Sequence, residues 1–69
     1  MSDSVYKIIE LVGSSPNSWD DAAKNAVELA ASSLKDIRIA EVSKLDLKME
    51  NGKVATYRAR VKVSFKYQK

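Results

Sequence analysis

The residues of this chain that could do chemistry are carboxylates, guanidinium groups and ammonium groups, because the sequence contains no histidine and no cysteine. That absence excludes Cys–His and Ser–His–Asp nucleophile systems, disulfides and the usual zinc sites. Ser14 and Ser15 lie in an expected turn, and Gly13 alone does not make a phosphate loop. Since no nucleophile–base pair or paired acids can be recognised, we expect a protein that is not an enzyme.

Basic side chains gather on one face of the last two predicted strands. With a net charge of +3, this face could attract phosphates or nucleic acid. A platform for single strands also needs interleaved aromatic residues, which this face lacks. We therefore favour a solvated or lumenal face that Glu41 and Asp46 partly neutralise, and expect no nucleic-acid partner, while a small anionic ligand remains compatible with both interpretations. The basic residues are Arg38, Lys44, Lys48, Arg58, Arg60, Lys62 and Lys66.

Four elements must position these side chains. Residues 5–12 are β-branched and aromatic, which predicts a strand that is apolar on both faces and ends at Gly13. Ser18 is expected to cap a helix over residues 19–34, with Asp21 at the capping-box position and an alanine-rich apolar stripe. Alternation over residues 37–50, and again from Tyr57 to Tyr67, predicts two more strands.

A hairpin turn joins the last two strands at Asn51-Gly52. A two-residue loop would set an apolar face against a charged one, so we predict a three-residue loop, Glu50-Asn51-Gly52. The alternation is blurred between Glu41 and Lys44, where a bulge or an interface is plausible. The expected opposite pairs are Leu45 with Tyr57, Ile39 with Val63, Ile37 with Phe65, and Lys44 with Arg58.

The last of these pairs places two cations opposite each other, which destabilises a strand pair. We therefore predict that Arg58 is neutralised by an acid from a neighbouring subunit or by a bound anion.

The fold class predicted from this order is α+β: a β-α-β-β chain whose three-stranded antiparallel sheet, in order 1-3-2, packs on one amphipathic helix, with residues 1–69 forming one domain. Hairpin strands of about 14 residues span roughly 45 Å, whereas the helix spans roughly 24 Å. The apolar side chains near the turn therefore have no cover from their own chain, which predicts an oligomer. No apolar run is long enough to span a membrane, no signal peptide is recognisable, and we expect a cytoplasmic protein. The uncovered residues are Leu45, Leu47, Met49, Val54 and Tyr57.

Short segments spread from Val5 to Phe65 together resemble the dodecin family. That resemblance implies a hollow shell of twelve identical subunits which stores or buffers flavins such as riboflavin or FMN. The segments are Val5-Tyr6-Lys7, Glu10-Leu11-Val12-Gly13-Ser14-Ser15, Ser18-Trp19-Asp20-Asp21-Ala22, Asn51-Gly52-Lys53-Val54 and Ser64-Phe65.

The resemblance also locates the flavin-binding positions. The tryptophan that stacks on the flavin in typical members corresponds to Ile39, and the glutamine that hydrogen-bonds the flavin edge corresponds to Arg58. Ile39 has no aromatic face, and Arg58 has five donors but no acceptor. We therefore expect weakened or lost flavin binding. We interpret Trp19 as a core or interface anchor. Further ligand or interface positions are Arg38, Glu41, Lys44 and Arg60.

One branch of the family carries an aliphatic residue and an arginine at these two positions, and a member of it is described as calcium-binding. Calcium takes six to eight oxygen ligands, so a site would have to be assembled from several chains. The candidate ligands are Asp46, Glu41 and Glu50, each of which also has a structural interpretation as a cross-strand or turn residue. The favoured function is a self-assembling shell that binds a small ligand, and the alternatives are calcium binding and flavin storage.

Overall fold

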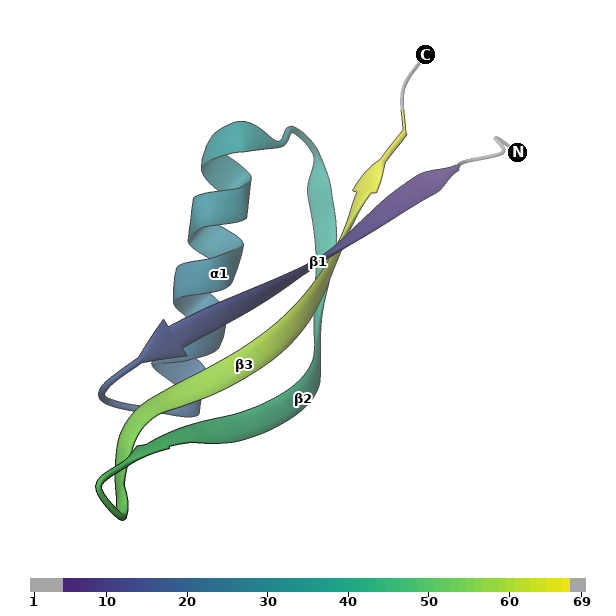
Figure 1. The fold of residues 1–69 in the computed structure, drawn as a ribbon. Coiled ribbons are helices and arrows are strands. Elements are labelled where there is room, and N and C mark those ends of the chain that lie inside the picture. The colour runs from purple at the N-terminus through teal and green to yellow at the C-terminus, as the bar shows by residue number, and fades with distance from the viewer. Residues whose placement is uncertain (1–4, 68–69) are drawn as a thin grey trace.

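The computed structural model describes residues 5–67. Strand β1 (Tyr6–Ser15) leads into helix α1 (Trp19–Ser33), which is followed by β2 (Ile37–Glu50) and β3 (Lys53–Lys66). The strands form one antiparallel sheet in the order β1-β3-β2, and α1 lies against one face of it (Figure 1). The predicted α+β class and strand order are confirmed. Within the described range, no helix is long and apolar enough to cross a membrane.

Strand β1 ends three residues later than predicted, because Gly13, Ser14 and Ser15 continue the ladder with β3. Gly13 is buried at a point where α1 lies close against the sheet. A Cβ added there would overlap the carbonyl oxygen of Ala22 and lie 2.9 Å from the Cβ of Ala26. Gly13 therefore allows close contact between strand and helix and does not end the strand.

Helix α1 begins at the predicted cap, where the Ser18 hydroxyl accepts a hydrogen bond from the Asp21 N–H at 3.0 Å. The Asp21 carboxylate accepts a 2.7 Å hydrogen bond from the buried Ser15 hydroxyl, so it fastens the end of β1 to the helix. The helix ends at Ser33, one residue earlier than predicted, and Leu34 is its C-cap. The core between helix and sheet is built from small residues: Ala22, Ala26, Ala30, Ala59, Val61 and Val63.

The hairpin turn differs from the prediction. Glu50 pairs with Lys53, so the loop has two residues, Asn51 and Gly52, whose positive φ angles of 52° and 74° are typical of a type I′ turn. The three-residue loop was wrong because Ala55 forms a bulge directly after the turn, between the pairs Met49–Val54 and Lys48–Thr56. This extra residue restores the match between apolar faces.

Two further register shifts occur on β2, at Arg38 and at Ser43. The shift at Ser43 confirms the irregularity predicted between Glu41 and Lys44, and the Ser43 hydroxyl donates to the Arg60 carbonyl at 3.2 Å. Of the predicted pairs, Ile37 with Phe65 is confirmed and the other three are wrong. The observed pairs are Leu45 with Ala59, Leu47 with Tyr57, Ile39 with Ser64, and Lys44 with Arg60.

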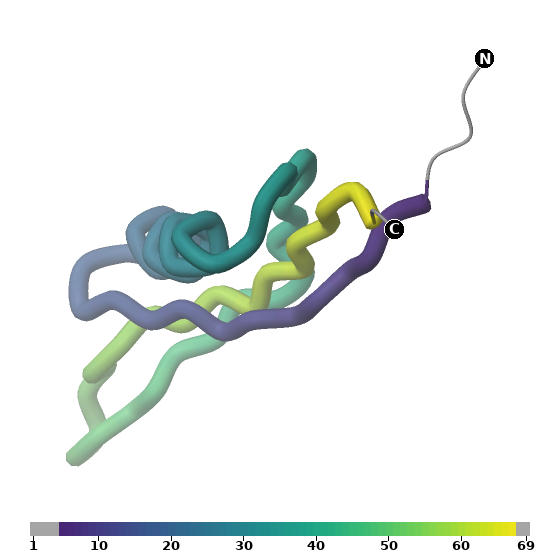
Figure 2. Tube along the Cα trace, turned by 90° about the horizontal axis from the view of Figure 1, so that it is seen from above, coloured from purple at the N-terminus to yellow at the C-terminus, as the bar shows by residue number. Residues whose placement is uncertain are grey.

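The bulges determine on which of the two faces of the sheet each side chain lies. The face under α1 carries the core, and we call the opposite face the outer face. Because Ser43 changes the alternation of β2, Ile39 and Glu41 join Arg58 and Arg60 on the outer face. Figure 2 shows that α1 covers one side of the sheet only.

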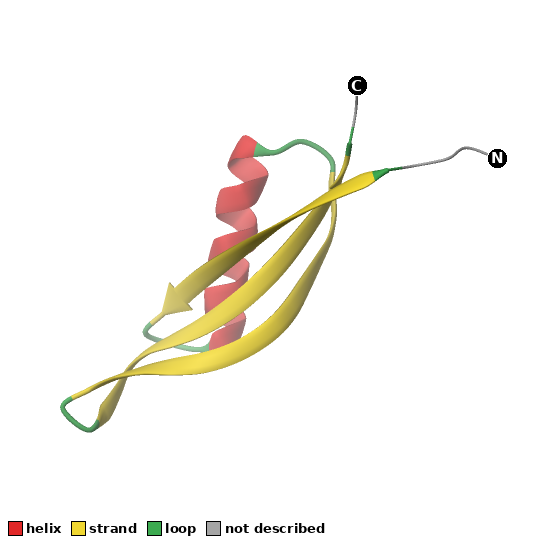
Figure 3. Ribbon diagram, turned by 45° about the vertical axis from the view of Figure 1, so that its right-hand side comes forward, coloured by secondary structure: helices red, strands yellow, loops and turns green. Residues whose placement is uncertain are grey.

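The two-stranded end of the hairpin, residues 48–56, extends past the end of β1 and the start of α1 (Figure 3). The molecule is correspondingly long, with extents of 54 × 20 × 15 Å. Four of the five predicted uncovered side chains are exposed, at 38–53%, and Tyr57 is half-buried. The predicted lack of a cover from the same chain is confirmed for Leu45, Leu47, Met49 and Val54.

Candidate functional site

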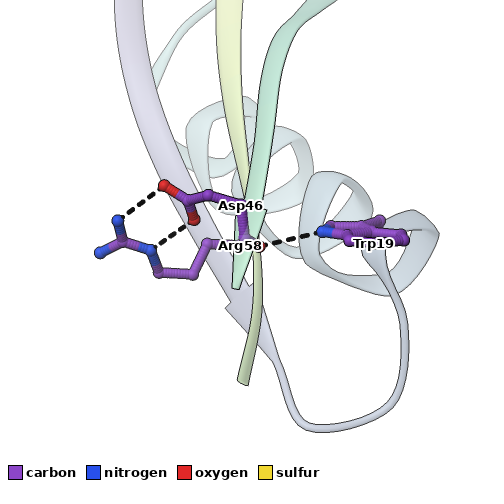
Figure 4. Close-up of polar contacts among 3 residues, drawn as sticks. All are labelled: Trp19, Asp46 and Arg58. Carbon is purple, nitrogen blue, oxygen red and sulfur yellow. Dashed lines mark hydrogen bonds and ion pairs between the residues drawn. The ribbon is translucent and has the colours of Figure 1, made fainter. Parts of the chain in front are cut away.

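The central polar contact of the outer face joins Arg58 to Asp46, which lie directly opposite each other on β3 and β2. The Arg58 Nε donates to Asp46 Oδ1 at 2.7 Å, and its Nη2 donates to Asp46 Oδ2 at 2.8 Å (Figure 4). The hydrogen bond from Arg58, reinforced by its charge, lowers the pKa of Asp46. The same contact raises the pKa of Arg58.

This pair corrects two expectations. The cation opposite Lys44 is Arg60, not Arg58. The acid that neutralises Arg58 comes from the same chain, where we predicted an acid of a neighbouring subunit or a bound anion. The reason is the bulge at Ala55, which moves Asp46 directly opposite Arg58.

Trp19 connects the start of α1 to Asp46, the residue that pairs with Arg58. Its indole N–H donates to the backbone carbonyl of Asp46 at 3.0 Å (Figure 4). Its ring meets Tyr57 edge-on, with 5.3 Å between ring centroids and an interplanar angle of 82°. The side chain thus joins α1 to both hairpin strands, while about a third of Trp19 remains exposed.

The two positions singled out as a ligand site, Ile39 and Arg58, lie on the same face but do not meet. Ile39 is opposite Ser64, six residues along β3 from Arg58, which is about 20 Å at the usual rise per residue. Ile39 is 64% exposed. A small ligand that contacts both positions must therefore lie where two chains meet.

Charge on the outer face is arranged in rows across the sheet. Lys62 lies between Glu10 on β1 and Glu41 on β2, so the predicted basic face is partly neutralised. Arg60 and Lys44 lie next to each other without an acid in their row. Arg38 is the bulged residue between Ile37 and Ile39, so no residue of β3 lies directly opposite it. Of the cations proposed for an anionic ligand, only Lys44 and Arg60 therefore share a row.

Sequence reasoning did not assign the apolar residues that β1 adds to the outer face. Tyr6, Ile8 and Val12 are 48–62% exposed, and Ile8 lies in one row with Ser64 and Ile39. The sequence did show that this strand is apolar on both faces, which indicates that both faces are covered by other elements or chains. One cover is α1, and in the described part of the chain the second side lies open.

A family model for dodecin matches residues 5–68. The chain belongs to the dodecin family. Calcium dodecin of Mycobacterium tuberculosis is 46% identical over 63 residues, covering 91% of this chain and 89% of that protein.

Solved dodecin structures share the whole fold. The dodecin from Streptomyces coelicolor superposes with a TM-score of 0.92 at 33% identity, covering 100% of this chain and 99% of that chain. The structure of the M. tuberculosis calcium dodecin, described as calcium-chelating with a novel calcium-binding site, has a TM-score of 0.84 at 47% identity, covering 94% and 93% of the two chains.

The acids proposed as calcium ligands lie apart in this dodecin-family chain. Both carboxylate oxygens of Asp46 accept from Arg58. Glu41 lies opposite Lys62, and the Glu50 Oε2 is 3.7 Å from the Lys48 Nζ. Residues 5–67 of one chain bring together no three acids that could hold a metal ion. A calcium site built from these residues needs ligands from more than one copy.

Proposed function

We propose that this dodecin-family chain, as one domain over residues 1–69, builds a cytoplasmic shell of twelve copies that binds or stores a small ligand. It does so without catalysis, and its flavin binding is weakened or lost. The observation that carries the second part is the ion pair of Arg58. Two of its donor nitrogens already bind Asp46, and a guanidinium has no acceptor, so Arg58 cannot replace an amide at a flavin edge.

Ile39 supports the same conclusion from the other end of the outer face. Its aliphatic side chain is exposed opposite Ser64 and has no π-system for stacking on a planar ring. In place of the flavin edge, Lys44 and Arg60 offer two adjacent cations on that face. A small anion is thus the ligand chemistry that the outer face fits better.

Calcium binding is the second candidate, favoured by the 46% identical relative named calcium dodecin. In this chain the candidate ligands Glu41, Asp46 and Glu50 would act only after assembly. They would contribute carboxylate oxygens from neighbouring copies.

A titration separates these functions. Riboflavin fluorescence is followed as the purified full-length protein is added, and calcium binding is followed in parallel by isothermal calorimetry. Weak or absent quenching is expected, whereas nanomolar quenching contradicts the proposed loss of flavin binding. If the protein takes up calcium and the Glu41→Gln variant does not, calcium binding becomes the favoured function. A preparation analysed by mass spectrometry and elemental analysis then identifies any small molecule or metal that co-purifies.

A further inference from the structure

The hairpin turn combines a reactive side-chain amide with an unhindered backbone nitrogen. Asparagine is among the heat-labile residues of proteins, and its amide is lost fastest when glycine follows, because glycine has no side chain to obstruct attack by its own nitrogen. Asn51 and Gly52 are both exposed. A Cβ placed on Gly52 meets no atom within 4 Å, so the surroundings of the turn leave room for a reaction there.

The reaction in question is deamidation, and its only co-reactant is water. The backbone nitrogen of Gly52 loses its proton and bonds to Cγ of Asn51, the bond from Cγ to Nδ2 breaks, and ammonia leaves. The product is a five-membered succinimide ring, which water opens at either of its two carbonyl carbons. Opening at Cγ gives ordinary aspartate. Opening at the main-chain carbonyl gives isoaspartate, in which the main chain continues through the former side chain.

The attacking nitrogen is free in the folded chain. The ladder between β2 and β3 closes with the pair Glu50–Lys53, and the turn lies outside it. Among the backbone hydrogen bonds that residues 5–67 form in turns, loops and caps, none is donated by the Gly52 N–H. No bond between backbone groups therefore has to break before this nitrogen can react.

The other two asparagines of the chain lack this combination. Asn25 lies inside α1, where the N–H of the following residue is bonded along the helix, and its own amide donates to the Ser14 carbonyl at 3.2 Å. Asn17 is followed by Ser18, which carries a side chain. Both residues are exposed, so they serve as internal controls that differ from Asn51 in backbone setting and not in access to water.

Ring closure also requires the Cα–C bond of Asn51 to rotate out of the left-handed turn, where φ is 52°. The hairpin end is well suited to such local opening. β1 ends opposite Tyr57, so residues 48–56 form a two-stranded ribbon beyond the helix (Figure 3). The bulge at Ala55 interrupts its ladder three residues after Gly52. Exposed segments with few packed neighbours open at a small fraction of the global free energy of unfolding.

We propose that Asn51 is a site of spontaneous modification in the folded protein, where it converts to isoaspartate and aspartate, and that isoaspartate opens the hairpin end. Isoaspartate adds one methylene carbon to the main chain of the loop. A type I′ turn closes a loop of two ordinary residues, and hairpin register depends on that loop, so the pair Glu50–Lys53 is lost. Both products also add one negative charge and lower the net charge of +3 by one.

Mass spectrometry of the purified full-length protein tests the conversion. The protein is incubated for weeks near neutral pH, folded or unfolded in guanidinium chloride, and cleavage after lysine then releases residues 49–53. A sample cleaved at once corrects for deamidation during the digestion. In the folded protein Asn51 is expected to convert several-fold faster than Asn17 and Asn25, and methyl transfer from S-adenosylmethionine by an isoaspartyl methyltransferase identifies the isoaspartate. Unchanged Asn51 in folded protein, while the unfolded sample converts, overturns the proposal, as does aspartate without isoaspartate.

Urea unfolding tests the effect on the hairpin. Ion exchange in urea separates the modified chains by their lost positive charge, and they are then refolded. The matched control is Asn51→Asp, which has the same charge on an ordinary backbone and is expected to resemble the natural protein, because Asp-Gly also favours a type I′ turn. The isoaspartate form is expected to unfold at lower urea concentration than this control. Equal midpoints for the two would overturn the proposed opening of the hairpin end.

Discussion

Arg58 and Asp46 form a two-bonded ion pair directly across the β2–β3 ladder, at 2.7 and 2.8 Å. The backbone carbonyl of the same aspartate accepts the indole N–H of Trp19. One residue of β2 is therefore held by its side chain from β3 and by its main chain from α1. This arrangement stabilises the hairpin at the point where it leaves the cover of the helix.

The pH dependence of stability should change when Asp46 is neutralised. Arg58 lowers the pKa of Asp46 in the folded protein, so the pair stabilises the fold above the unfolded pKa, about 3.9. That contribution is lost as pH falls through the lower, folded value. Asp46→Asn is therefore expected to reduce stability at pH 7 and to approach the natural protein in acid, as measured by urea unfolding at several pH values. Glu50→Gln, which alters the looser 3.7 Å contact with Lys48, is the control. A stability difference that stays constant from pH 7 to pH 2 contradicts the prediction.

Restoring the flavin-binding residues should raise riboflavin affinity. Ile39→Trp supplies an aromatic face worth about 0.5–1.5 kcal/mol, which corresponds to an increase of about 2- to 13-fold per ring. Arg58→Gln adds an acceptor on the outer face and frees Asp46 from its bidentate partner. The double variant is expected to quench riboflavin fluorescence at lower protein concentration than either single variant. Ile39→Leu serves as the control for altered packing and should behave like the natural protein.

Trp19→Phe separates the hydrogen bond of Trp19 from its ring contact. Phenylalanine keeps an aromatic ring beside Tyr57 but loses the donor to the Asp46 carbonyl, so we expect a loss of about 0.5–1.5 kcal/mol in the free energy of unfolding. Trp19→Leu removes both contacts and should cost more. Urea unfolding measures the two losses. No loss in Trp19→Phe would show that the indole hydrogen bond contributes nothing, and equal losses in the two variants would show that the ring contact contributes nothing.

The two glycines should respond differently to alanine. At Gly13 a Cβ meets the carbonyl oxygen of Ala22 and the Cβ of Ala26, so Gly13→Ala forces strand and helix apart at a cost of about 1–3 kcal/mol. At Gly52 a Cβ meets open space, but φ is 74°, so Gly52→Ala costs about 1–2 kcal/mol through backbone conformation alone.

Asparagine substitutions distinguish the steric contact at Gly13 from the backbone conformation at Gly52. Gly52→Asn should recover most of the Gly52→Ala loss, because asparagine tolerates a left-handed backbone. Gly13→Asn should be worse than Gly13→Ala, because the larger side chain meets the same helix backbone. Thermal unfolding of the four variants measures both orders, and recovery at Gly13 by asparagine would contradict the close approach of α1.

Much of the fold could be predicted because it depends on local chemistry. Ser18 caps the helix through its own hydroxyl, Asn51 and Gly52 adopt the left-handed angles that a tight turn needs, and alternation in the last strand selects its buried face. These features involve residues close together in the sequence. The order of elements then leaves few topologies, and the observed β1-β3-β2 sheet was among them.

Three bulges determined the register of the hairpin, and the sequence indicated only the one at Ser43, through the blurred alternation between Glu41 and Lys44. Each inserts one residue, at Ala55, Ser43 or Arg38, and each exchanges the two faces for every later residue of its strand. A bulge has a small local signature, because the alternation on either side of it stays regular. Its position is chosen by the whole sheet, which must satisfy a two-residue turn and still match apolar faces under α1. The partner of Arg58 and the face of Ile39 follow from that choice, so composition and spacing identified these residues, but only the tertiary structure determined which side chains they meet.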